Sequence, residues 1–89
     1  MEYRLVKVTW KDIEGYEGAW MSMDDIEESS PVTIETLGWI VVEDESYITM
    51  VSSLSLDQSF GGSVTAIPRG CVESIVLVSE LSECFDEKI

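Results

Sequence analysis

The chain has 89 residues, 18 of them acidic and five basic, and a formal net charge of −13 at pH 7. Such an excess of carboxylates opposes nonspecific attraction to nucleic acid, because neutralising phosphates requires clustered Lys and Arg side chains. The sequence contains no histidine, which excludes Ser-His and Cys-His nucleophile pairs and the common zinc hydrolase sites. We therefore expect a protein that is not an enzyme and that uses no cofactor or metal.

The length predicts one small domain that hides only about 60 to 65% of its unfolded surface. Its two cysteines, Cys71 and Cys84, can form one disulfide at most, so association with further copies is the expected source of extra stability. The opening MEYRLVKVTW alternates charged and apolar residues, unlike a signal peptide or a membrane span. We expect a cytoplasmic protein with no membrane partner.

The N-terminal third predicts one strand and one short helix. Residues 3–10 are rich in β-branched and aromatic side chains, and Val6, Val8 and Trp10 alternate onto one face of a strand. Gly-punctuated residues 11–20 predict a loop, or a loosely paired extended segment that ends at Trp20. Next, MSMDDIEESSP has an N-capping serine, acids in the first turn and a proline beyond the end, which predicts a helix of two or three turns at most.

From Val32 onward the pattern predicts four more strands joined by short turns. Residues 32–43 form the first, with Gly38 as a pivot where a curved sheet bends. After the acidic turn at residues 43–46, the return strand YITMVSSLS follows. The inward side chains expected on these two strands are Val32, Ile34, Ile40, Val42, Ile48, Met50 and Leu54.

The last two predicted strands are SVTAIP and CVESIVLV, separated by Arg69-Gly70. The final strand has apolar side chains on both faces, so it needs a cover on both sides. In so short a chain, a neighbouring subunit is the expected cover. Together these elements predict a mainly β fold: one strongly bent five-stranded barrel over residues 1–78, a helix inserted after its first strand, and an acidic tail over residues 79–89.

The stretch from Gly38 to Leu77 resembles the Sm-like (LSm) family of small five-stranded, SH3-like barrels. GWIVVEDESYITMV resembles its first motif, and IPRGCVESI resembles its second, with Ile67, Val72 and Ile75 at the family spacing of five and eight residues. The resemblance implies a cyclic homo-oligomer of about five to seven subunits and the binding of single-stranded RNA. Small acidic proteins of this kind are common in phages, so a divergent family member from a phage or phage-like source would fit this sequence.

The resemblance assigns two sets of residues. The RNA-binding set is Arg69, Gly70, Asp44 and Tyr47. The subunit interface, along the edges of the last two strands, is Val64, Ala66, Ile67, Val72, Ile75 and Val76. The sequence departs from the family because Ser46 and Ile48 replace its stacking residue and its asparagine, and Pro68 moves Arg69 one place along the chain.

Two alternatives concern charge. Arg69 can contact a base or a phosphate, or it can form an ion pair with Asp44 or a neighbouring carboxylate, which suits a guanidinium equally well. The acidic surface can likewise bind a basic protein, acting as a protein-binding module or as a mimic of nucleic acid.

Overall fold

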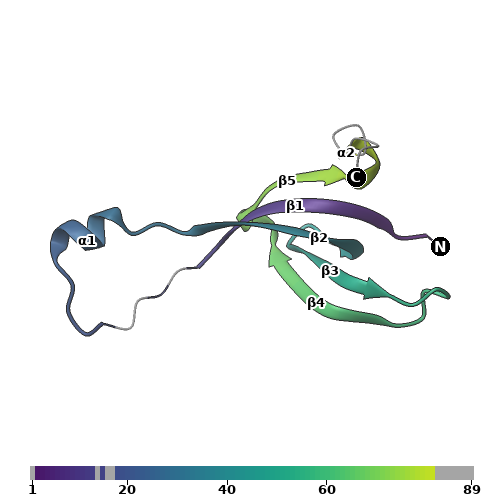
Figure 1. Cartoon of the computed structure of the whole chain (residues 1–89), viewed down its shortest axis with the longest axis horizontal. Coiled ribbons are helices and arrows are strands. Elements are labelled where there is room, and N and C mark those ends of the chain that lie inside the picture. The colour runs from purple at the N-terminus through teal and green to yellow at the C-terminus, as the bar shows by residue number, and fades with distance from the viewer. Residues whose placement is uncertain (1, 14, 16–17, 82–89) are drawn as a thin grey trace, which may run out of the picture.

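The structure is a computed structural model that describes residues 2–13, 15 and 18–81. Its centre is one antiparallel sheet of five strands in the order β4-β3-β2-β1-β5 (Figure 1). The strands are β1 (Arg4–Asp12), β2 (Val32–Glu43), β3 (Tyr47–Leu54), β4 (Gly61–Pro68) and β5 (Val72–Leu77). The helices are α1 (Met23–Glu28), the 3-10 turn η1 (Arg69–Cys71) and α2 (Val78–Leu81).

The mainly β prediction is confirmed, as is the position of one short helix after the first strand. Within the described ranges the sheet is open, since β4 pairs with β3 and β5 pairs with β1, and each keeps one free edge. Barrel closure therefore stays a prediction. The expected tail begins as helix α2, and its remainder, residues 82–89, lies outside the described residues. No described helix is long and apolar enough to cross a bilayer.

The core lies on one face of the sheet. The fully or almost fully buried side chains packed together there are Val6, Val8, Ile40, Ile48, Met50 and Ile67. Alternation along β1 and β3 predicted most of this set correctly, because every second side chain of a strand points to the same face. Trp10, Val72 and Ile75 pack at its margin, and the indole N–H of Trp10 donates to Thr36 Oγ1 at 3.0 Å.

A bulge in β2 changes which residues point inward. Ile40 pairs with Met50, but Val42 rather than Val41 pairs with Thr49, so one extra residue is inserted. An inserted residue reverses the faces of the side chains that follow it. The prediction that Val42 points inward is therefore wrong, and Val42 is 38% exposed.

Residues 18–31, which precede β2, project away from the sheet (Figure 1). Figure 1 shows α1 at the far end of this projection, remote from β3, β4 and β5. Ser22 caps the helix by accepting a hydrogen bond from the backbone N–H of Asp25 at 3.1 Å, as the sequence predicted. We call the described residues 18–31 the arm.

At Gly38 the backbone of the neighbouring strand leaves no room for a side chain. A Cβ there would fall against the backbone carbonyl of Val51, whereas a Cβ at Gly70 would meet nothing within 4 Å. We expect Gly38→Ala to lower the free energy of unfolding by about 1–3 kcal/mol, because a backbone shift must relieve the overlap. Gly70→Ala is the control and should change it by less than about 1 kcal/mol. Urea denaturation checks both, and equal effects would contradict this account of Gly38.

Candidate functional site

The structure brings the four residues predicted for RNA binding into one cluster, where the turn between β2 and β3 meets the start of η1. The backbone N–H of Arg69 donates to the carbonyl of Ser46 at 2.9 Å, and the Arg69 Nε donates to the carbonyl of Asp44, also at 2.9 Å. Asp44 N–H donates to the carbonyl of Tyr47 at 3.0 Å, which closes the turn. Gly70 follows Arg69 within η1.

The Arg69 guanidinium is engaged by carboxylate as well as by backbone. Its Nη2 lies 3.5 Å from Glu43 Oε2, while the other oxygen of Glu43 accepts from Arg4 Nη2. One carboxylate thus joins the start of β1, the end of β2 and η1. The ion-pair alternative for Arg69 is therefore present, with Glu43 as the partner instead of the Asp44 side chain. That side chain instead accepts from the Ser46 N–H at 2.8 Å.

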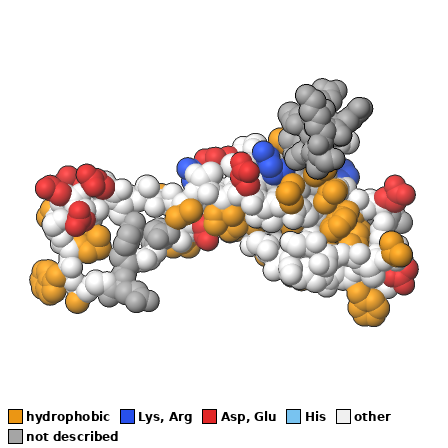
Figure 2. All heavy atoms as spheres, in the orientation of Figure 1, with side chains coloured by type: hydrophobic (Ala, Val, Ile, Leu, Met, Phe, Trp, Pro, Cys, Tyr) orange, Lys and Arg blue, Asp and Glu red, His pale blue; other side chains and the backbone are white. Residues whose placement is uncertain are grey.

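Basic side chains elsewhere are also paired. Lys7 Nζ lies 3.8 Å from Glu35 Oε1, and Lys11 Nζ lies 3.6 Å from Glu73 Oε1. The described residues contain four basic side chains in all, Arg4, Lys7, Lys11 and Arg69, and each contacts a carboxylate. On the face drawn in Figure 2, acidic side chains gather around α1 and at the opposite end of the molecule, and the few basic ones lie between, next to further acidic side chains. The charge left uncompensated is negative.

The predicted interface residues lie on the two edge strands. On β4, Val64 is 65% exposed and Ala66 is exposed, whereas Ile67 is fully buried in the core. On β5, Val72, Ile75 and Val76 are half-buried, the first two against the core. An edge strand contacts a neighbour through its backbone, so Ile67 can contribute only main-chain groups.

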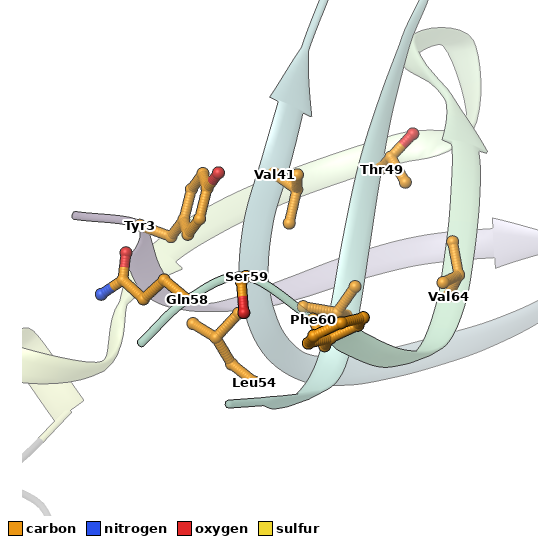
Figure 3. Close-up of a pocket in the computed structure, with 10 residues that line it drawn as sticks. Tyr3, Val41, Thr49, Leu54, Gln58, Ser59, Phe60 and Val64 are labelled. Atoms are coloured by element: carbon orange, nitrogen blue, oxygen red, sulfur yellow. The ribbon is translucent and has the colours of Figure 1, made fainter. Parts of the chain in front are cut away.

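A pocket of about 290 Å³ lies on the sheet beside β4, and the sequence did not predict it. Its walls come from β2, β3, β4 and the loop between β3 and β4 (Figure 3). The lining residues are Tyr3, Val41, Thr49, Val51, Leu54, Gln58, Ser59, Phe60, Gly61 and Val64. Sequence reasoning missed it because the β2 bulge at Val41 and the left-handed backbone of Gln58, with φ 61°, shape the walls.

Asp57 organises the loop beside this pocket. Its Oδ1 accepts from the hydroxyl of Ser59 at 2.6 Å, from the hydroxyl of Ser55 at 2.8 Å and from the backbone N–H of Ser59 at 3.0 Å. These donors favour the ionised carboxylate. They lower the pKa of Asp57 from 3.8 to about 2, with the Ser59 hydroxyl as the largest cause.

The described residues contain no group of three or more Cys, Asp or Glu side chains placed to hold a metal ion. The chain matches no protein-family model, no curated protein and no solved structure.

Removing the Arg69 side chain tests its structural role. We expect Arg69→Ala to lower the free energy of unfolding by about 0.5–1.5 kcal/mol, because the Asp44 carbonyl and the Glu43 carboxylate lose a donor. Lys7→Ala is the control, since its single contact of 3.8 Å with the exposed Glu35 should contribute less than about 0.5 kcal/mol. Thermal or urea unfolding measures both changes. Equal losses would show that Arg69 does not hold the turn.

The low pKa of Asp57 predicts an acid-dependent loss of stability. The folded state prefers the carboxylate, so its contribution is full above pH 3.8 and is lost as the pH falls through about 2. Asp57→Asn removes this contribution, so the variant should lose less stability than wild type over that interval. Urea titrations at each pH, together with the pKa of Asp57 from NMR, provide the measurement. Identical pH profiles for the two proteins would contradict the hydrogen-bonding account.

Proposed function

We propose that the chain is a non-catalytic, Sm-like assembly module whose copies join head to tail, β4 of one against β5 of the next. The observation that carries this proposal is the open sheet with β4 and β5 at its two edges. Free edges expose unpaired N–H and C=O groups, which another strand can satisfy. Because the two edges are different surfaces, each contact is heterologous, and a suitable rotation per contact closes a ring.

The side chains along the edges support the same proposal. Val64 and Ala66 are exposed on β4, where a neighbour would cover them. On β5, the half-buried Val76 lies between Ile75 and Leu77, which pack at the margin of the core. By resemblance to the Sm-like family, such a ring would contain about five to seven copies. Each copy would be one barrel-like module.

For the partner of this assembly, the charges favour a basic protein. Each described basic side chain already faces a carboxylate, and the surplus acids are left for outside cations. Complementary charge speeds encounter and selects partners. The module would then act as an acidic protein-binding scaffold, with a surface that imitates nucleic acid.

RNA is the partner implied by the family resemblance, and its expected site is the cluster of Asp44, Tyr47, Arg69 and Gly70. Tyr47 is 42% exposed, and aromatic and guanidinium groups are common contacts for bases. To bind a phosphate, however, Arg69 would have to exchange its pairing with Glu43 at 3.5 Å. We therefore rank RNA below a basic protein.

Light scattering tests the assembly. Wild type should be oligomeric at micromolar concentration, and Val64→Arg on the β4 edge should raise the dissociation constant about tenfold or more by placing charge in the contact. Leu37→Arg is the matched control, because Leu37 is 58% exposed but lies on the interior strand β2. A strictly monomeric wild type, or equal effects of both variants, would contradict edge pairing.

Titration of labelled uridine-rich RNA at low salt tests the ranking of partners. We expect little or no binding, because the surplus charge of the protein repels phosphates that little salt screens. Measurable wild-type binding that disappears in Arg69→Ala, while the oligomer persists, would reverse the ranking and make RNA the favoured partner.

A further inference from the structure

The arm carries apolar side chains that the domain leaves exposed. Trp20 is 92% exposed, Met23 67% and Ile26 44%, and no residue of α1 is buried. Figure 1 shows α1 too far from β3, β4 and β5 to share their core. Scattered single apolar residues are ordinary on a surface, but apolar residues gathered on a projection indicate an interaction site.

The helix in the arm is shorter than helices that are stable alone. It spans six residues, whereas isolated helices below about 12 residues are marginal in water. Its end contacts are local: Ser22 caps the start, and the N–H of Ser29 donates to the Ile26 carbonyl at 3.2 Å. Docking against a second surface would supply the tertiary packing that this helix lacks.

Spacing gives the helix one apolar stripe bordered by acids. Met23 and Ile26 are three residues apart and share a face of the helix. Trp20 lies three residues before Met23, outside the helix. The acidic residues of the helix are Asp24, Asp25, Glu27 and Glu28. Described residues 18–31 contain no basic side chain. The complementary surface is therefore apolar and bordered by Lys or Arg.

A second copy of this chain fits that description poorly. The described basic side chains that could border such a surface are Arg4, Lys7, Lys11 and Arg69, and all four face carboxylates of their own chain. The pocket beside β4 is apolar enough for an aromatic side chain, but Asp57 lies next to it in a chain of net charge −13. Charge complementarity thus selects a different, basic protein.

We propose that the arm is the docking element for that basic protein. Trp20, Met23 and Ile26 enter its apolar surface, and the acids of α1 pair with the Lys or Arg residues around it. This inference depends on the proposed binding of a basic partner and is independent of ring formation. It assigns the two contacts of the module to separate places, the edges of the sheet for copies of itself and the arm for the partner.

Two labelled peptides serve as probes: a short amphipathic helix of Leu and Lys, and an oligolysine of equal charge. Fluorescence anisotropy should show that wild type binds the Leu/Lys peptide at least about tenfold more tightly than oligolysine. Trp20→Ser should remove most of that advantage, because a buried Trp commonly dominates a contact. Leu56→Ser is the control, since Leu56 is fully exposed in the β3–β4 loop outside the pocket lining, and it should leave the affinity unchanged.

A second variant, Met23→Ser with Ile26→Ser, should reproduce the loss, and circular dichroism should show a gain of helix when the Leu/Lys peptide binds wild type. Equal affinity for the two peptides, or equal losses from Trp20→Ser and Leu56→Ser, would overturn the proposal. Light scattering runs in parallel. If Trp20→Ser lowers the oligomer mass and leaves peptide binding intact, the arm contacts a second copy and the proposal is wrong. Edge pairing is judged separately by Val64→Arg.

Discussion

The structure depends on β1 pairing on both of its sides, with β2 and with β5. This double pairing makes β1 an interior strand, and its Val6 and Val8 are completely buried. It also determines which strands are left as edges. On one side of β1 the sheet ends with β5, and on the other side it continues through β2 and β3 and ends with β4. A small domain that hides little surface thus keeps two backbone edges available for association.

Much of the sheet follows from local patterns. Alternation along β1 and β3 was enough to identify Val6, Val8, Ile48 and Met50 as inward. The open sheet order, in contrast, is a long-range property of strand pairing that alternation does not encode. The bulge after Ile40 was also missed, since an inserted residue has no distinctive side chain here and reveals itself only through the register with β3.

The candidate site was predicted in part for a similar reason. The resemblance placed Asp44, Tyr47 and Arg69 in one set, and they lie together because Tyr47, at the start of β3, pairs with Pro68, at the end of β4. Their role in binding RNA stays a prediction. The choice of Glu43 as the carboxylate partner of Arg69 needed the structure, since residues 43–45 are all acidic and strand geometry alone decides which one faces η1. The exposure of Trp20 was unpredictable from composition, which favours aromatic residues inside.

The order of the strands along the chain has a consequence for folding. The pairs β2 with β3 and β3 with β4 join neighbouring segments, whereas β1 and β5 lie at opposite ends of the described chain. Contacts between distant segments carry the larger loop-closure cost and form late. A newly made chain therefore completes its β5 edge last. In the proposed assembly, a subunit gains the second surface needed to extend a ring only once its own core is closed, which keeps half-folded chains out of the growing oligomer.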